Sequence, residues 1–173
     1  LQYFRHGLVI GSACEAGEWY RTVLSLYRAN QKSVPATQKA LEHSSIQLGR
    51  FYDYFEIQPI ENNLFYLRDP ESGLDGREDL QNINRIICQF GKKLKKPVCA
   101  TSDAHFLDEK DAVLRSILLT DQGYEDADQS ADLHFRTTEE MLKAFAYLGE
   151  EQARKVVIDD PRKISSLISP DLK

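Results

Sequence analysis

The sequence predicts an α/β protein in which short parallel strands alternate with amphipathic helices. Three short apolar or aromatic segments have the composition of strands, at residues 8–10, 51–57 and 98–101. Helical patterns lie between them, and this order is typical of parallel βαβ units. In such units, functional side chains lie just beyond the carboxyl ends of the strands. We therefore look for a site first in residues 12–18 and 102–105.

Length and composition indicate a globular domain or a large piece of one. The chain has 173 residues and is 42% hydrophobic and 28% charged. Its formal net charge of −5 argues against binding of duplex DNA by bulk charge, which needs clustered cations. A nucleic-acid enzyme whose DNA contacts lie in other domains stays open. We expect no membrane association, because no apolar run approaches the ~20 residues of a membrane span.

The cysteines indicate a reducing compartment. Cys14, Cys88 and Cys99 are an odd number in separate contexts, so we expect a cytoplasmic protein and no secreted disulfide framework. The sequence starts at Leu1 and enters an apolar strand pattern almost at once, so we expect a piece of a longer protein. The alternative is a naturally short protein from which a tag has been removed.

Three helical patterns precede the third strand. The first has one buried stripe at helical spacing, formed by Trp19, Val23, Leu26 and Tyr27. A second helix is expected from Pro35 to about Leu48, whereas residues 60–77 are rich in turn residues and are expected to be loop. The third helix is the clearest, with an unbroken apolar face formed by Leu80, Ile83, Ile87, Phe90 and Leu94.

More helices are predicted after the third strand. The helix that Asp108 can cap would turn four apolar side chains inward, namely Val113, Leu114, Ile117 and Leu118. Residues 121–132 are acidic and expected to be loop. A Thr-x-x-Glu capping box starts a helix at Thr137, and Gly149 can close it. A further helical pattern continues until Asp160-Pro161, which is expected to break it before a last short helix.

A carboxylate and an imidazole follow the third strand directly. Asp103 and His105 are two residues apart, so in an extended chain they face the same side. A divalent metal accepts such a pair of oxygen and nitrogen ligands at ~2.0–2.2 Å. The alternative is a helix-entry Asp beside a surface His. Spacing alone favours the second interpretation, but the position at a strand end supports the metal interpretation about equally.

Cys14 lies at the corresponding place after the first strand, in a polar turn. As a thiolate it could ligate a metal or act as a nucleophile. The alternative is a small buried hydrophobe, which we expect for Cys88 and Cys99. No neighbouring histidine supplies the base that a nucleophile needs. The other histidines are expected to be surface or structural residues, namely His6, His43 and His134.

Four lysines surround the end of the clearest helix. Such a run is most often a solvated helix C-terminus that the helix dipole favours, and a phosphate-binding group is the alternative. The lysines are Lys92, Lys93, Lys95 and Lys96.

Five segments resemble, in order, the PHP (polymerase and histidinol phosphatase) domain of PolC-type DNA polymerase III, a family of bacterial replicative polymerases. Together they span most of the chain, and five matches in register are a stronger signal than any one of them. The segments are residues 11–18 (GSACEAGE), 51–59 (FYDYFEIQP), 96–108 (KPVCATSDAHFLD), 135–142 (FRTTEEML) and 147–151 (YLGEE).

The resemblance implies a fold and a metal site. PHP domains are distorted barrels of (βα)7 type, so this chain would be a partial barrel of parallel strands with flanking helices. Residues 1–135 would be the C-terminal part of the PHP domain, and residues 136–173 a helical C-terminal extension leading toward the polymerase core. The last metal motif of the family matches Asp103 and His105, and its Cys ligand matches Cys14. The metal would be zinc or manganese.

Other parts of the family would lie outside this sequence. The leading His-x-His motif is absent from it. The proofreading exonuclease would be inserted upstream, and the palm with its magnesium-binding carboxylates would follow Lys173. The resemblance therefore places no polymerase catalytic residue in this chain and identifies no DNA-binding residue. Half a barrel also leaves strand edges unpaired, so either self-association or a rearranged packing is expected.

Three functions are compatible with these features. The first is a part of a DNA-directed DNA polymerase, a nucleotidyltransferase of chromosome replication, with the isolated chain inactive. The second is a free-standing PHP-type metal-dependent phosphoesterase. The third is a purely structural PHP module. The missing His-x-His motif and the polymerase-like residues from Phe135 onward count against the second.

Overall fold

The computed structural model describes residues 4–123 and 132–169. They form a small parallel sheet surrounded by helices, which confirms the α/β class, although most of the regular structure is helical. Within the described residues the sheet has two strands, so the barrel that the resemblance implies is not seen. No helix in the described ranges is long and apolar enough to cross a membrane.

The two strands pair in parallel. β1 (Phe55–Ile57) lies beside β2 (Val98–Ala100), with Glu56 opposite Cys99. β2 confirms the third predicted strand. The second predicted strand is too long, because Phe51 is the last residue of a helix and pairing starts only near Tyr54.

Residues 8–10 run beside β1 but do not form the predicted strand. Their contact is a single parallel bridge between Gly11 and Tyr54. The Ile10 N–H donates to the Asp53 carboxylate at 2.8 Å, and the Asp53 N–H donates to the Ile10 carbonyl at 2.7 Å. A side chain thus takes the place of a ladder acceptor, which interrupts regular pairing.

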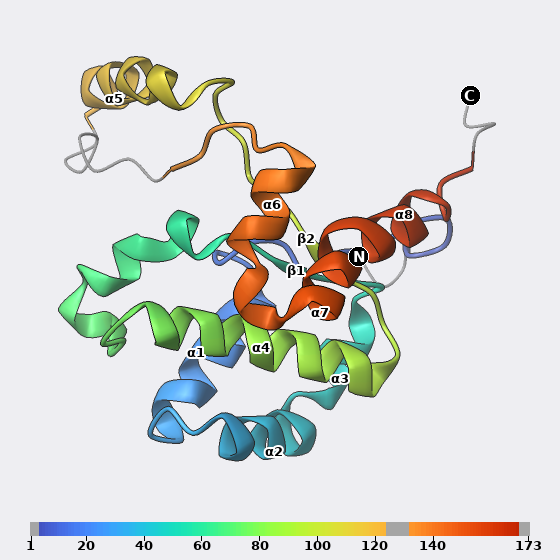
Figure 1. Cartoon of the computed structure of the whole chain (residues 1–173). Helices are drawn as coiled ribbons and strands as arrows, with labels where there is room; N and C mark the ends of the chain where they lie inside the picture. The colour runs from blue at the N-terminus through green and yellow to red at the C-terminus, as the bar shows by residue number, and fades with distance from the viewer. Residues whose placement is uncertain (1–3, 124–131, 170–173) are drawn as a thin grey trace.

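Helices α1 and α4 form most of the core against the sheet. α1 (Glu18–Ala29) buries Trp19, Val23 and Tyr27 of its predicted stripe, whereas Leu26 is half-buried. α4 (Arg77–Leu94) runs through the molecule beneath the sheet in Figure 1 and buries the predicted apolar face except Leu94, which is half-buried. At Gly91 a Cβ atom would lie 2.4 Å from Val98 Cγ2, so only glycine lets α4 approach β2 this closely.

The second predicted helix is divided in two. α2 (Val34–Ser44) ends at Ser45, and α3 (Ile46–Phe51) follows. Lys96 explains why α3 can end beside the sheet: its Nζ donates to the carbonyls of Gly49, Arg50 and Tyr52. Lys96 therefore caps a helix C-terminus and does not belong to a solvated lysine run.

Residues 60–77 are more regular than the predicted loop. They contain a 3₁₀ helix over Ile60–Leu67 and a short 3₁₀ turn over Pro70–Ser72. Asn62 and Asn63 are buried there although both are polar. The turn residues predicted a loop here, and they reveal neither the 3₁₀ helix nor its packing against α4.

The C-terminal helices pack on the open side of β2. α6 (Thr138–Ala144) starts with the predicted capping box between Thr137 and Glu140, and Gly149 follows it with φ +85°. α7 (Glu150–Arg154) continues through a π-helical turn into α8 (Asp160–Ser165). The predicted break at Asp160-Pro161 is wrong, because Pro161 lies in the first turn of α8, where its missing N–H is tolerated.

α5 (Ala112–Asp121) contradicts its predicted packing. The four side chains expected to face inward, Val113, Leu114, Ile117 and Leu118, are 58%, 58%, 61% and 62% exposed. Figure 1 shows α5 standing apart from the body, at the end of an arm. The spacing of apolar residues predicts which face of a helix is apolar, but it does not predict what packs against that face. The predicted acidic loop at 121–132 lies mostly outside the described residues.

Asp160 connects the C-terminal helices to the sheet. Its side chain is 1% exposed, and its Oδ2 accepts the Val98 N–H at 3.0 Å. Lys155 and Lys163 also donate to this carboxylate. Burial acts to raise the pKa of Asp160, but the Lys155, Val98 and Lys163 hydrogen bonds outweigh it and hold the pKa below its ordinary value.

We predict that Asp160 makes the fold acid-sensitive. The folded-state pKa of Asp160 lies below the ordinary pKa of ~3.9 that it has in the unfolded chain. Its stabilising effect is therefore complete above the ordinary pKa and is lost as pH falls toward and through the folded-state pKa. Asp160→Asn should lower the free energy of unfolding at pH 7 by about 1–3 kcal/mol and flatten its decline between about pH 5 and 2. Urea unfolding at several pH values measures both effects.

Asp159→Asn is the matched control. Asp159 is 42% exposed and lies 3.9 Å from Arg154, so this variant should follow the wild-type pH curve. If Asp160→Asn loses stability in acid as steeply as the wild type does, the role assigned to Asp160 is wrong.

Candidate functional site

The turn that contains Cys14 is fastened to β1. The Ser12 hydroxyl is buried and accepts the Glu56 N–H at 2.9 Å. The Gly17 N–H donates to the Cys14 carbonyl at 2.9 Å and closes the turn. A Cβ atom on Gly17 would lie 2.4 Å from the Ser12 carbonyl oxygen, so glycine is required for this close approach. The half-buried Cys14 is thereby held near the sheet.

Asp103 and His105 lie on exposed chain that follows β2. Asp103 has a φ of +53°, a left-handed conformation that is uncommon for residues other than glycine. His105 Nδ1 lies 2.8 Å from the Asp103 carbonyl oxygen, so it donates there, and its distance to Asp103 Oδ1 is 3.9 Å. The bond leaves Nε2 as the acceptor nitrogen of the ring, which is the nitrogen a metal would take.

Cys14 lies within electrostatic range of Asp103. Burial raises the pKa of the Cys14 thiol, and the negative charges of Glu15 and Asp103 raise it further. A thiol in this setting stays protonated, which disfavours the nucleophile interpretation. A bound cation would reverse the effect, because it stabilises the thiolate.

The described residues do not close a metal site. Within residues 4–123 and 132–169, no group of three or more His, Cys, Asp or Glu side chains is placed to hold a metal. Zinc sites use three or four protein ligands. Cys14, Asp103 and His105 have suitable donor atoms, but within the described ranges the structure does not bring the three together as one metal-binding group. Their assignment as ligands stays a prediction.

The predicted burial of the other cysteines and histidines is mostly confirmed. Cys88 is buried, as predicted, whereas Cys99 is half-buried in β2. Burial raises the pKa of both thiols, that of Cys88 to about 12 and that of Cys99 to about 11, so neither is an activated nucleophile. His43 is exposed on α2.

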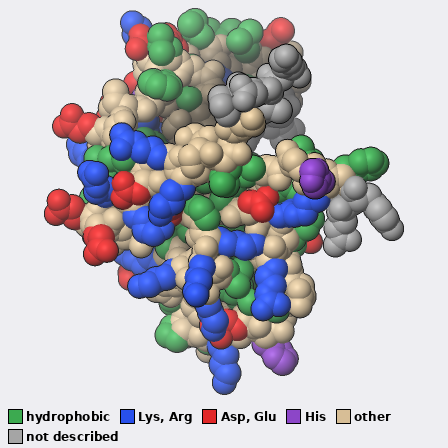
Figure 2. Space-filling model, turned by 90° about the vertical axis from the view of Figure 1, so that its right-hand side faces the viewer, with side chains coloured by type: hydrophobic (Ala, Val, Ile, Leu, Met, Phe, Trp, Pro, Cys, Tyr) green, Lys and Arg blue, Asp and Glu red, His purple; other side chains and the backbone are tan. Residues whose placement is uncertain are grey.

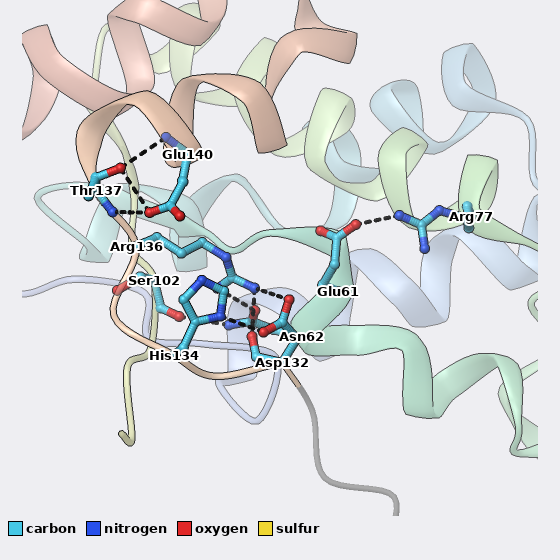
Figure 3. Close-up of polar contacts among 9 residues, drawn as sticks. All are labelled: Glu61, Asn62, Arg77, Ser102, Asp132, His134, Arg136, Thr137 and Glu140. Carbon is cyan, nitrogen blue, oxygen red and sulfur yellow. Dashed lines mark hydrogen bonds and ion pairs between the residues drawn. The ribbon is translucent and has the colours of Figure 1, made fainter. Parts of the chain in front are cut away.

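His134 belongs to a polar cluster that the sequence did not reveal (Figure 3). We define the anchor cluster as Asn62, Asp132, His134 and Arg136. His134 Nδ1 and Asp132 Oδ1 are 2.6 Å apart, and Arg136 Nη2 donates to the Asp132 carbonyl at 2.6 Å. Arg136 Nη1 reaches Asn62 Oδ1 at 3.3 Å, and the Arg136 side chain is only 4% exposed.

The anchor cluster joins three separate segments at the carboxyl end of β2. Asn62 comes from the 3₁₀ helix after β1, and its Nδ2 donates to the Ser102 carbonyl at 3.0 Å. Arg136 comes from the chain that returns from α5. The only sequence signal was an Asp-x-His spacing at 132–134 followed by an arginine, and this pattern does not indicate a buried arginine.

A polar hollow of about 510 Å³ adjoins the anchor cluster. Its charges are largely paired: Arg77 bonds Glu61, Arg136 bonds Asp132, and Glu140 caps α6 through Thr137. Four carboxylates and three Lys or Arg side chains line it, so it lacks the excess positive charge of a phosphate site. The cluster therefore holds chain segments together.

Backbone bonds continue this connection toward α5. The His105 N–H donates to the Leu133 carbonyl at 2.8 Å, and the Phe135 N–H donates to the Phe106 carbonyl at 2.9 Å. The outgoing and returning chains thus lie side by side in parallel, with a bridge between Phe106 and His134. The base of the arm is fixed to the body, and His105 is part of that base.

Comparison with known proteins shows what the chain is related to. It is 46% identical to the DNA polymerase III PolC-type of Clostridium perfringens over 165 residues, which is 95% of this chain and 10% of that protein. The chain is a relative of one region of PolC-type DNA polymerase III. The corresponding protein of Caldanaerobacter subterraneus is 48% identical over 95% of the chain, and that of Bacillus subtilis is 36% identical over all of it.

These findings confirm the resemblance to PolC-type polymerases. The chain spans about a tenth of the length of the polymerases that it matches. No family model matches the chain, so the PHP domain itself has no independent support from that comparison. Most of the length of these polymerases therefore lies outside the region that matches this chain.

We predict that Arg136 stabilises the arm through its two partners. Arg136→Lys keeps the charge but loses the planar fork that reaches both Asn62 and Asp132. The free energy of unfolding should fall by about 1–3 kcal/mol, and the His105 amide should exchange hydrogen faster. Chemical denaturation and hydrogen-exchange mass spectrometry measure these changes.

Arg77→Lys is the control for this prediction. Arg77 is 54% exposed and pairs with Glu61 at the surface, so its replacement should change stability by less than about 1 kcal/mol. Equal losses in the two variants would mean that the buried position of Arg136 is unimportant.

Proposed function

We propose that the chain is a module of a PolC-type replicative DNA polymerase, a DNA-directed nucleotidyltransferase. The observation that carries this proposal is the 46% identity over 95% of the chain to such a polymerase. The matches cover 95% or more of the chain in three such polymerases, so the similarity extends over the whole module and not over one motif. The chain supplies no polymerase active site, and with a net charge of −5 its DNA contacts belong to other domains.

The module corresponds to the C-terminal part of a PHP domain. Residues 1–135 would form part of its barrel, and residues 136–173 the helical extension toward the polymerase core. Three parallel segments with helices between them support this assignment, at residues 8–12, β1 and β2. Cys14 and Asp103 follow the carboxyl ends of two of these segments, the position at which such folds carry functional side chains.

Cys14, Asp103 and His105 would contribute ligands to a zinc or manganese site of that domain. His105 offers Nε2, since Nδ1 is engaged with the Asp103 carbonyl. Residues from another part of the polymerase would complete the ligand set. A metal bound there would tie distant segments together, so that its binding energy becomes folding energy. The magnesium ions of polymerisation would belong to the palm.

A purely structural module is the second candidate. The lack of a third converging ligand within the described residues favours it over an independent phosphoesterase. In this case the three residues would hold the turn and the arm in place without a metal.

The polymerase proposal predicts that this chain can replace its counterpart. A chimera of the Clostridium perfringens polymerase, with this sequence in place of the aligned 165 residues, should extend a DNA primer. The same chimera with Trp19→Asp should lose soluble polymerase, because Trp19 is fully buried among aromatic rings. A soluble, folded chimera without primer extension would contradict the proposal.

The metal proposal predicts ligand-specific loss of metal. After loading with Mn²⁺ or Zn²⁺ and desalting, that chimera should retain metal at near-stoichiometric amounts, as measured by elemental mass spectrometry. Cys14→Ala and His105→Ala should each lower the retained metal by about 10-fold or more. Cys99→Ala and His43→Ala are the matched controls and should retain it. Unchanged metal content in the first two variants would favour the structural module.

A further inference from the structure

α5 presents an apolar face that nothing in the described chain covers. We define the α5 face as Val113, Leu114, Ile117 and Leu118. No residue of this ten-residue helix is buried. Figure 2 shows hydrophobic side chains gathered at the top of the molecule, the height at which α5 lies in Figure 1.

Apolar side chains are also exposed at the base of the arm. Leu107 is 69% exposed on the outgoing chain, and Phe135 is 59% exposed on the returning chain. A hollow of about 440 Å³ lies between the base and the helix. Its lining includes Phe106, Leu114, Leu118 and Leu119. Exposed apolar side chains on one helix, beside a hollow with an apolar lining, indicate an interaction site.

Helix physics also requires a partner for α5. An isolated helix shorter than ~12–15 residues is marginal in water, and most helical stability in proteins comes from packing of the apolar face. α5 has ten residues and packs none of its apolar face on the body. The base of the arm is nevertheless fixed by the anchor cluster, so the face is held in a defined direction.

We propose that the α5 face docks against another segment of the same polymerase polypeptide. This inference rests on the proposed function, since the PolC-type relatives contain about nine-tenths of their length outside the region that matches this chain. The docking segment presents an apolar groove or an apolar helix face to α5. It lies beside the carboxyl end of β2, because the arm starts there.

The size of the face favours an intramolecular partner over a second copy. A ten-residue helix is about 15 Å long, so one of its faces is far smaller than the ~800 Å² that each partner buries in a stable complex. Tethering within one polypeptide raises the effective concentration to about the millimolar range, at which a small apolar contact suffices.

Hydrogen exchange tests the proposal in the chimeric polymerase and in the 173-residue chain. Amides of residues 112–121 should exchange about tenfold or more slowly in the polymerase than in the short chain, while α4 amides serve as the internal reference. Leu118→Lys should abolish this protection in the polymerase. Ser116→Lys is the control, because it adds the same charge two positions before Leu118, on the side of the helix away from Leu114 and Leu118.

Two outcomes would overturn the proposal. Equal exchange of residues 112–121 in both proteins would show that α5 has no partner in the polymerase. Protection in the short chain that rises with its concentration, and is no greater in the polymerase, would assign the face to a second copy. Primer extension is measured on the same samples, so that failed docking in an active polymerase leaves the proposed function standing. Protection in an inactive polymerase would support docking alone.

Discussion

Packing of three aromatic rings is the contact on which the rest of this fold depends. Trp19 lies 4.9 Å from Phe55 and 4.8 Å from Phe90, measured between ring centroids, and all three side chains are fully buried. They come from α1, β1 and α4, so one contact joins the first helix, the sheet and the longest helix. Aromatic groups bury large apolar areas, and such a cluster fixes these elements relative to each other. The turn at Cys14 and the end of β2 are thereby brought near each other.

The sequence was sufficient for elements whose signals are local or periodic. The α1 stripe and the α4 face were predicted because a buried helix repeats apolar side chains at helical spacing. Likewise, the capping box at Thr137 needs only residues three positions apart. Boundaries that depend on distant contacts were missed. α3 ends where Lys96 caps it, and residues 8–10 fail to pair fully because Asp53 takes the place of a ladder acceptor. Neither contact can be predicted from the spacing of residues close together in the sequence.

The candidate site was predictable only as far as strand ends indicate position. Cys14 and Asp103 do lie within electrostatic range, although β1 lies between the segments that they follow. The buried Arg136 was missed because burial of an arginine depends on partners far along the chain, here Asn62 at a separation of 74 residues. The error at α5 has the same origin. Its spacing identifies the apolar face, but the covering surface is a property of other residues.

The proposed metal ligands Asp103 and His105 and the uncovered α5 face lie on the same segment, which follows β2. Each of the two would need a different kind of surface on a partner. The proposed metal site would need additional polar donors near His105, whereas α5 needs apolar surface. The hydrogen bond from the His105 N–H to the Leu133 carbonyl lies between the two places and holds the base of the arm in one geometry. A partner segment could therefore satisfy one demand without the other. Metal content and α5 protection consequently report on different contacts, and loss of one in a variant does not require loss of the other.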